Sequence, residues 1–374
     1  MRTFVFTCLL LLGMTTFAQD ANFHIYLCLG QSNMEGNAKV EEQDTVAVDS
    51  RFQVLAAVDC PNLGRTKGNW YKAVPPLARC YTGLTPGDYF GRAMVANLPS
   101  NVQVGIINVA VGGCKIELFD KDNYQSYVET SPDWLKNMVK EYGGNPYARL
   151  VEMAKLAQKD GVIKGILLHQ GESNTNDKDW PSKVKGVYDN LLKDLGLSAA
   201  NVPLLAGEVV HADQNGICAS MNTIIDSLPQ VIPTAHVISS AGCPAAFDNL
   251  HFTAEGYRIL GARYAAKMLS ILGYGDWTSA QNMKLWYARP AQDWLEALPL
   301  GNSRLGTMVF GGTAREELQL NEETFWAGGP YNNNNPKGLQ VLPEIRRLIF
   351  EGKTLEAQKL IDENYMTPQH GMRY

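Results

Sequence analysis

The sequence predicts a three-layer α/β/α domain with a parallel sheet over residues 20 to about 273, followed by a smaller, partial β-rich domain. Apolar runs typical of buried strands alternate in the first region with amphipathic stretches of helical spacing. This alternation favours a parallel sheet that helices cover on both faces. The apolar content of 45% is ample for a packed core, and a charged fraction of 19% does not indicate disorder.

Five apolar runs are expected to form the strands of this sheet. Each run is short and bounded by turn residues or by a helical pattern, which is typical of a strand buried on both faces. The runs are residues 23–30, 102–113, 162–172, 202–210 and 235–240.

Three amphipathic stretches are expected to form covering helices. Residues 146–160 begin with proline, which suits the first position of a helix, and carry an apolar stripe. Residues 181–196 end at a glycine, a common helix terminator. Residues 254–273 follow Thr253, whose hydroxyl is a typical N-cap.

The chain length of 374 residues suggests two domains. Residues 274–282 have the composition of a linker, and residues 283–374 are rich in Trp, Gly and Pro before a helical pair that breaks at Gly352. We interpret residues 283–374 as an incomplete domain, because so short a segment supplies only part of a large β-sandwich. Its missing partners are expected to leave apolar side chains exposed. These side chains are Trp286, Trp294, Phe310 and Trp326.

Residues 1–18 have the features of a secretory signal peptide: Arg2, then an apolar stretch, then a small-residue cleavage site near Ala18. The apolar stretch is shorter than the ~20 residues of a membrane span. We therefore expect a secreted or periplasmic protein without a membrane segment after cleavage. A net charge of −5, without a run of basic residues, argues against nucleic acid as a partner.

Six cysteines lie beyond the signal peptide, and an even number in an exported chain permits disulfides. Cys60 and Cys80 flank a loop-like segment rich in Gly, Pro and Asn, and they are the expected pair. Cys28 and Cys114 lie in or beside apolar strands and suit the role of small buried hydrophobic residues.

Four loops of the first domain carry reactive or polar residues, and they follow or adjoin the predicted strands. They are residues 30–33, 112–113, 169–174 and 248–251. Because the carboxyl ends of parallel strands lie on one edge of a sheet, these loops can converge there. Each loop alone is common in structural turns, but the four in this order are hard to obtain by chance.

The convergent loops contain the parts of a serine-based acyl-transfer site. Ser32 is the candidate nucleophile, and His251 is the base that takes its proton. Asp248, three residues before His251, is the carboxylate that would orient the imidazole and stabilise its charged form.

A tetrahedral oxyanion also needs preorganised hydrogen-bond donors. We expect the backbone N–H groups of Ser32 and of either Gly112 or Gly113 to supply two of them. The side-chain amide of Gln170 or of Asn174 is the candidate third donor. The polar side chains expected to contact substrate are Gln31, Asn33 and Asn174.

The segments "GQSNM", the Gly-Gly pair, "HQGESN" and "DNLHFTAEGY" together resemble the SGNH-hydrolase superfamily. Within it they are similar to the sialate O-acetylesterase and acetylxylan-esterase branch, carbohydrate esterase family 6. The resemblance covers roughly residues 22–272. It implies a flavodoxin-like α/β/α fold and removal of acetyl esters from sugars. It also implies that Ser32 is the nucleophile, His251 the base and a glycine of the pair an oxyanion donor.

The third block departs from the wider superfamily, in which it usually reads Gly-x-Asn-Asp. Here it is "QGESN", so the resemblance implies Gln170 as the oxyanion side chain and makes Glu172 a rival to Asp248 as triad acid. We prefer Asp248, because it needs only one loop to meet His251, whereas Glu172 needs two.

The segment after residue 282 resembles a different family. "LWYARPAQDWLEALPLGNSRLGTMVFGG" and "LQLNEETFWAGGP" are similar to the N-terminal β-domain of family 95 glycoside hydrolases, the α-L-fucosidase-like group. In that family the catalytic carboxylates lie in a helical barrel far downstream of this domain. We therefore predict no glycosidase activity for residues 283–374.

The resulting hypothesis is a secreted serine esterase that removes O-acetyl groups from carbohydrate through an acyl-enzyme. Its partner would be an acetylated carbohydrate such as a sialate, xylan or another plant or mucin glycan, with no cofactor and no metal. Three alternatives stay open: the front portion of an α-L-fucosidase-type hydrolase, a non-catalytic glycan-binding module, and a metal hydrolase. The last would use His169, Glu172, Asp248 and His251. The sequence makes no prediction of oligomeric state.

Overall fold

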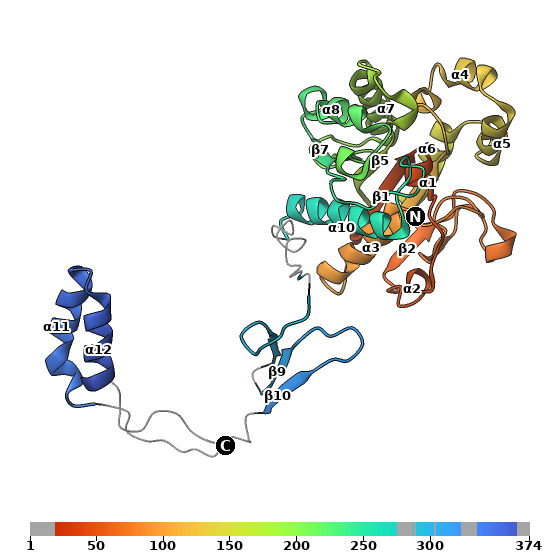
Figure 1. Cartoon of the computed structure of the whole chain (residues 1–374). Coiled ribbons are helices and arrows are strands. Elements are labelled where there is room, and N and C mark those ends of the chain that lie inside the picture. Colours follow the sequence, from red (N-terminus) through yellow and green to blue (C-terminus); the bar gives the residue numbers. More distant parts are fainter. Residues whose placement is uncertain (1–18, 275–286, 288, 303, 323–334, 365–374) are drawn as a thin grey trace, which may run out of the picture. The chain divides into compact units, whose positions relative to one another are not determined.

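The computed structural model describes residues 19–274, 287, 289–302, 304–322 and 335–364 (Figure 1). The chain divides into two compact units, Met1–Met283 and Lys284–Tyr374. The predicted signal peptide, most of the predicted linker and the side chains of Trp286 and Trp326 lie outside the described residues. No helix within the described ranges combines the length and apolar character needed to cross a membrane.

The first unit is built on a seven-stranded sheet whose order is β3-β2-β4-β1-β5-β6-β7. Every neighbouring pair is parallel except β2 and β3, so the expected parallel sheet is confirmed with one antiparallel edge strand. The strands are β1 (Asp20–Gly30), β2 (Phe52–Leu55), β3 (Trp70–Lys72), β4 (Gln103–Ala110), β5 (Gly161–His169), β6 (Leu204–Gly207) and β7 (Ala235–Ile238).

The two faces of this sheet pack against different helices (Figure 1). Alternate residues of β1 show the division: Ile25, Leu27 and Leu29 enter one core, while Tyr26 and Cys28 enter the other. The first core includes α6 (Pro146–Ala157) and α7 (Trp180–Leu195), and the second includes α3 (Pro86–Asn97) and α10 (Ala254–Ile271). The predicted three layers are therefore present.

Shorter helices connect these elements. They are α1 (Ser32–Glu35), α2 (Glu42–Thr45), α4 (Tyr124–Thr130), α5 (Asp133–Glu141), α8 (Asn222–Ile225) and α9 (Leu228–Val231). Single 3₁₀ turns occur at Pro61–Leu63, Ile116–Phe119, Glu172–Asn174, Ala212–Gln214 and Ala219–Met221.

A disulfide joins Cys60 to Cys80, with the two Cα atoms 5.2 Å apart. The predicted pairing is thus confirmed, and the bridge closes the loop that contains β3. Cys28 and Cys114 are free and buried, as expected for small hydrophobic residues.

The second unit contains a small antiparallel sheet and a pair of helices. The sheet has the order β10-β9-β8, from β8 (Leu298–Gly301), β9 (Leu305–Val309) and β10 (Leu318–Glu322). The expected helical pair is α11 (Gly338–Phe350) and α12 (Thr354–Asn364), and Gly352 lies between them with φ +74°.

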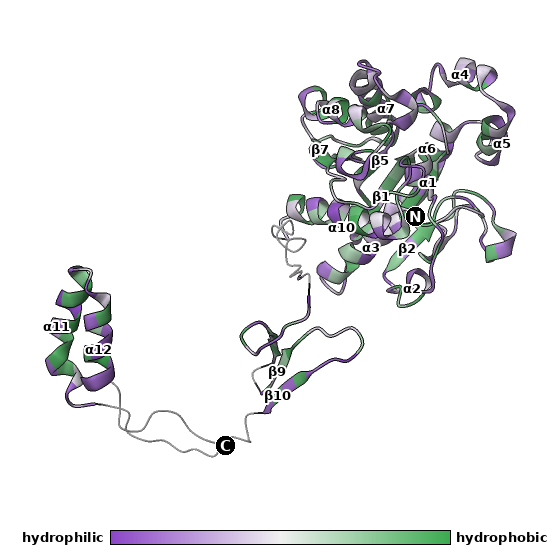
Figure 2. Cartoon of the chain, in the orientation of Figure 1, coloured by the Kyte–Doolittle hydropathy of each residue, from purple (hydrophilic) through white to green (hydrophobic). Residues whose placement is uncertain are grey.

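Many apolar side chains of the second unit are exposed. Figure 2 shows that α11 and α12 carry apolar residues as well as hydrophilic ones. Of the side chains expected to be exposed, Trp294 is 56% exposed, whereas Phe310 is partly buried. Among the other exposed apolar residues are Leu320 in β10, Leu339 and Phe350 in α11 and Leu355 in α12.

Candidate active site

The first loop begins where β1, between β4 and β5, reaches the carboxyl edge of the sheet. Gly30 is its last residue and pairs with Ala110 on β4 and His169 on β5. A Cβ at this position would lie 2.0 Å from the His169 carbonyl oxygen, so only glycine fits. Ser32 then opens α1, at the sheet edge where open α/β folds place their ligands.

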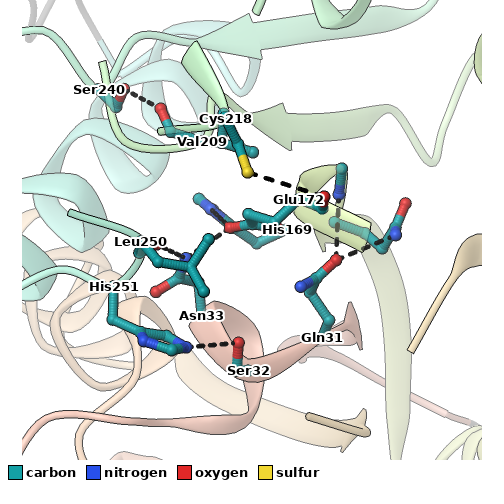
Figure 3. Close-up of polar contacts among 12 residues, drawn as sticks. Gln31, Ser32, Asn33, His169, Glu172, Val209, Cys218, Ser240, Leu250 and His251 are labelled. Carbon is teal, nitrogen blue, oxygen red and sulfur yellow. Dashed lines mark hydrogen bonds and ion pairs between the residues drawn. The ribbon is translucent and has the colours of Figure 1, made fainter. Parts of the chain in front are cut away.

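The structure brings Ser32, His251 and Asp248 together (Figure 3 shows the first two). His251 Nε2 lies 2.9 Å from Ser32 Oγ, and His251 Nδ1 lies 2.7 Å from Asp248 Oδ2. The other Asp248 oxygen accepts the backbone N–H groups of Leu250 and His251, each at 3.0 Å. This is the order of nucleophile, base and orienting acid that serine hydrolysis requires.

The environment of Asp248 favours its charged form. Burial acts in the opposite direction, but hydrogen bonds from the His251 ring and from two backbone N–H groups outweigh it and lower the pKa of Asp248. An ionised carboxylate at Nδ1 fixes the tautomer in which Nε2 is free to accept a proton.

Glu172 lies elsewhere in the site. Its Oε1 atom accepts a hydrogen bond from Asn33 Nδ2 and lies 3.6 Å from His169 Nε2 (Figure 3). Burial favours the neutral acid, but His169 and Asn33 lower the pKa of Glu172 below its usual value. Asp248, not Glu172, is the acid at His251 Nδ1, so the geometry does not support a triad role for Glu172.

Asn33 joins the nucleophile loop to the base loop. Its Nδ2 atom donates to the Leu250 carbonyl oxygen at 3.1 Å as well as to Glu172, and its Oδ1 atom accepts the Tyr257 hydroxyl at 2.6 Å. The side chain is fully buried. Both polar atoms of the Asn33 side chain have partners inside the protein, so the expectation that Asn33 contacts substrate is not supported.

Gln31 and Gln170 are also buried and bind each other. Gln31 Oε1 accepts from Gln170 Nε2 at 3.1 Å and from the Ser173 N–H at 3.2 Å. Gln170 Nε2 has two further acceptors, Asn174 Oδ1 at 2.7 Å and the Cys114 carbonyl oxygen at 3.3 Å. Its N–H groups are committed to these acceptors, so the expected oxyanion role of Gln170 is not supported either.

Asn174 completes this internal network. Its Nδ2 atom donates to Glu117 at 3.1 Å and to Asp177 at 3.0 Å, and its Oδ1 atom accepts the Ile116 N–H at 2.9 Å. Buried amides must satisfy their polar atoms within the protein. Asn33 and Asn174 therefore tie the loops together, where the sequence led us to expect substrate contacts. Gln31 contributes through Oε1, and within the described residues its Nε2 atom makes no hydrogen bond to protein, so a substrate contact by Gln31 stays a prediction.

The backbone around Gly113 offers an oxyanion donor. Gly113 has φ +70° in a turn closed by a hydrogen bond from the Cys114 N–H to the Val111 carbonyl oxygen. Ser173 Oγ donates to the Gly113 carbonyl oxygen at 3.0 Å. Within the described residues, no protein acceptor is bonded to the N–H of Ser32 or of Gly113. Gly113 is exposed, whereas Gly112 is buried beside the Glu35 carboxylate.

Several residues of the site were not predicted. The Tyr257 hydroxyl donates to Asn33, and the Ser173 hydroxyl donates to the Gly113 carbonyl oxygen. Glu35 and Arg79 form an ion pair beside Ser32. Of these residues, only Glu35 could have been recognised from the sequence, because a spacing of three residues places it on the same helical turn as Ser32.

His169, a candidate in the metal alternative, is fully buried at the end of β5. Its carbonyl oxygen accepts the Gln31 N–H at 3.0 Å, so its backbone fixes the start of the nucleophile loop. In the part of the chain that the structure describes, no group of three or more His, Cys, Asp and Glu side chains is arranged to hold a metal ion.

Comparison with known families identifies both parts of the chain. Residues 22–270 match the sequence model of the family described as carbohydrate esterase, sialic acid-specific acetylesterase. Residues 285–374 match the model described as the N-terminal domain of glycosyl hydrolase family 65. Both resemblances expected from the sequence, to the esterases and to the fucosidase-like group, are confirmed.

Individual relatives divide in the same way. A probable carbohydrate esterase of Arabidopsis thaliana is 26% identical over 262 residues, which cover 66% of this chain and 90% of the relative. Alpha-L-fucosidase 2 of the same plant is 41% identical over 75 residues, which cover 20% of this chain and 9% of the relative. This chain therefore spans less than a tenth of the length of that fucosidase.

A solved structure shows the same fold. The X-ray structure of a protein from Arabidopsis thaliana superposes with a TM-score of 0.51 at 22% identity and covers 66% of this chain and 98% of its own. The family match extends over more than half of the sequence. The chain therefore belongs to the family described as carbohydrate esterase, sialic acid-specific acetylesterase.

Proposed function

We propose that the protein is a secreted serine esterase that removes O-acetyl groups from carbohydrate through an acyl-enzyme intermediate. The observation that carries the proposal is the continuous hydrogen-bonded series Asp248–His251–Ser32, with contacts of 2.7 and 2.9 Å. Membership of a carbohydrate esterase family supports the class of reaction. The Cys60–Cys80 disulfide supports an oxidising compartment, as expected for an exported protein.

In the first half of the proposed reaction, Ser32 Oγ attacks the acetyl carbonyl carbon while its proton moves to His251 Nε2. Asp248 stabilises the imidazolium that forms. The N–H groups of Ser32 and Gly113 then donate to the oxyanion of the tetrahedral intermediate. Collapse of that intermediate breaks the bond to the sugar oxygen, which takes the proton from His251, and leaves the acetyl group on Ser32.

In the second half, His251 removes a proton from water as the water oxygen attacks the acetyl-serine. The same two N–H groups stabilise the second tetrahedral intermediate. Its collapse releases acetate and returns the proton from His251 to Ser32 Oγ, so the free enzyme is regenerated without a cofactor or a metal.

The substrate would be an acetylated glycan. The description of the matched family favours an acetylated sialate, and xylan and other plant or mucin glycans are the competing substrates. We propose no fucosidase activity for residues 283–374, because the similarity covers only 9% of the fucosidase. Glu316 and Glu317 are exposed in this unit, as ordinary solvated carboxylates are.

The test combines labelling with a substrate panel. A serine-reactive phosphonate should label Ser32 alone, as read by peptide mass spectrometry, and should abolish acetate release. Purified protein should release acetate from at least one of acetylated sialate, acetylated xylan and acetylated mucin glycans. Labelling elsewhere would contradict the serine mechanism, and so would activity that chelators remove and a divalent metal restores. Absence of acetate release from every member would favour a glycan-binding module.

A further inference from the structure

A buried ion pair connects the nucleophile helix to the disulfide-closed loop. Glu35 is the last residue of α1, three positions after Ser32, and is only 7% exposed. Arg79, next to Cys80 in the chain, donates to Glu35 Oε1 through Nε at 3.1 Å and through Nη2 at 2.6 Å. Its third nitrogen, Nη1, binds Glu141 on α5. Arg79 therefore binds Glu35 through two of its side-chain nitrogens and α5 through the third.

The second oxygen of Glu35 faces the glycine loop. A Cβ built on Gly112 would lie 2.9 Å from Glu35 Oε2 and 3.8 Å from Ser32 Cβ. The Gly112 backbone N–H is one of the groups that stabilise the ionised Glu35 carboxylate. The carboxylate thus lies between Arg79 and Gly112, where the helix that supplies one oxyanion donor packs against the loop that supplies the other.

The charge of Glu35 is unfavourable at this place unless it is balanced. Burial raises the pKa of Glu35 above its ordinary value, and the Arg79 guanidinium opposes that rise. A carboxylate left unpaired here would repel the negative charge that develops on the substrate oxygen beside Ser32. Arg79 removes that repulsion while it keeps the carboxylate available to Gly112.

The loop that carries Arg79 is itself fixed. The Cys60–Cys80 disulfide closes it, and Arg65 in the same loop donates to the Val74 and Pro76 carbonyl oxygens. The guanidinium of Arg79 is therefore presented by a constrained segment, and its side chain is 12% exposed.

We propose that Glu35 and Arg79 are positioning residues that hold α1 and the Gly112 loop in the geometry of the oxyanion hole and keep that hole free of net negative charge. The proposal rests on the proposed serine esterase function. It assigns a role in transition-state stabilisation to two residues that do not contact the reacting atoms.

The test is a double-mutant cycle of Arg79→Met and Glu35→Gln, with an aryl acetate as substrate. Loss of one oxyanion donor typically lowers kcat by about 10²–10³-fold, so we expect a somewhat smaller loss, on the order of 10–100-fold, for Arg79→Met. KM should stay within about threefold, because the interaction acts on the transition state. Affinity for a boronate that mimics the tetrahedral intermediate should fall by the same factor as kcat.

The double variant separates charge from structure. A neutral amide at position 35 needs no counter-charge, so Glu35→Gln combined with Arg79→Met should be at least about fivefold more active than Arg79→Met alone. Losses that simply multiply would contradict the proposal, because independent residues show no coupling. If Arg79→Met does not fold, Glu35→Gln decides alone: unchanged kcat and unchanged boronate affinity would contradict the proposal.

Arg258→Met is the matched control. Arg258 is also 12% exposed and also binds two carboxylates, Asp44 at 3.0 Å and Glu41 at 2.6 Å. The Arg258→Met substitution should lower the melting temperature without lowering kcat. A loss of kcat equal to that of Arg79→Met would contradict the proposal. Phosphonate labelling of Ser32 is scored separately: unlabelled wild-type Ser32 refutes the esterase mechanism, whereas labelled Ser32 with unaffected variants refutes only the role of Glu35 and Arg79.

Discussion

His251 Nε2 lies 2.9 Å from Ser32 Oγ, although 219 positions separate the two residues in the chain. The contact does not depend on the two loops alone, because Asn33 Nδ2 binds the Leu250 carbonyl oxygen at 3.1 Å, one residue from each partner. The nucleophile loop and the base loop are therefore joined directly by a buried hydrogen bond beside the reacting pair.

Replacement of the nucleophile is the first prediction. Ser32→Ala should lower kcat on an aryl acetate by at least about 10³-fold, because no hydroxyl remains to form the acyl-enzyme. Removing one small oxygen from a helix start should leave the melting temperature nearly unchanged. Ser126→Ala, in an exposed helical turn, is the control and should keep full activity. Substantial turnover by Ser32→Ala would exclude this mechanism.

The two acids of the site should respond differently. Asp248→Asn should lower kcat by about 10⁴-fold, since an amide at Nδ1 favours the wrong tautomer of His251. Glu172→Gln should lower kcat far less, by roughly tenfold, because Glu172 binds Asn33 and does not contact the His251 ring. Steady-state kinetics of both variants at one pH decide the matter. The reverse ranking would restore Glu172 as the triad acid.

The lowered pKa of Asp248 predicts a pH-dependent contribution to stability. A carboxyl whose pKa is depressed by folding stabilises the native state above its unfolded pKa, and this contribution disappears as the pH falls through the native value. Wild type should therefore be more stable than Asp248→Asn at pH 6, and the gap should close below about pH 4. Urea unfolding of both proteins from pH 6 to pH 3 measures this difference in the free energy of unfolding.

A control accompanies that measurement. Asp133 has a side chain that is 96% exposed, so the stability difference between wild type and Asp133→Asn should stay small at every pH. A gap for Asp248→Asn that is constant between pH 6 and pH 3 would show that the carboxylate is not stabilised by its hydrogen bonds.

Gly113→Ala should impair the oxyanion donor. The residue has φ +70°, and a Cβ there would lie 2.6 Å from the Trp134 ring, so both the backbone and the neighbouring side chain resist alanine. We expect kcat to fall by about 10-fold or more, with a smaller change in KM. Gly242→Ala is the control, since it has the same φ and no atom within 4 Å of its Cβ. Equal effects of the two substitutions would mean that only backbone strain is measured.

Truncation tests the independence of the first unit. A protein ending after Tyr274 contains both apolar cores of the seven-stranded sheet and all four loops of the site. It should unfold cooperatively in calorimetry and keep the kcat of the full chain within about twofold. Loss of folding or of activity on truncation would show that residues after 274 belong to the catalytic unit.

The central strands were predictable because continuous apolar runs have few alternatives to burial on both faces of a sheet. β2 and β3 escaped prediction, since they have four and three residues and β3 is an edge strand with a partly exposed pattern. The helix α3 was also missed. It is stabilised by a capping box between Thr85 and Asp88, while its two glycines weaken the helical pattern.

The reacting groups of the candidate site were predictable from chemistry and from their places after strands. The roles of the amides were not, because a sequence does not tell whether the polar atoms of Gln31 or Asn174 meet solvent or another buried side chain. The pairing of Glu35 with Arg79 was equally hidden, as the two are 44 positions apart and meet only when the disulfide-closed loop has folded.

The internal hydrogen bonds of Asn33, Gln170 and Asn174 have a consequence for how such enzymes diverge. These residues make the motifs recognisable, yet the side chains of all three are committed to hydrogen bonds that hold the loops together, so they are not available to contact a sugar. Discrimination between glycans must then reside in the exposed segments around Ser32, where substitutions do not disturb the catalytic framework. Two proteins with identical motifs can accordingly act on different acetylated sugars, and a new specificity can be engineered into those segments without touching the motifs.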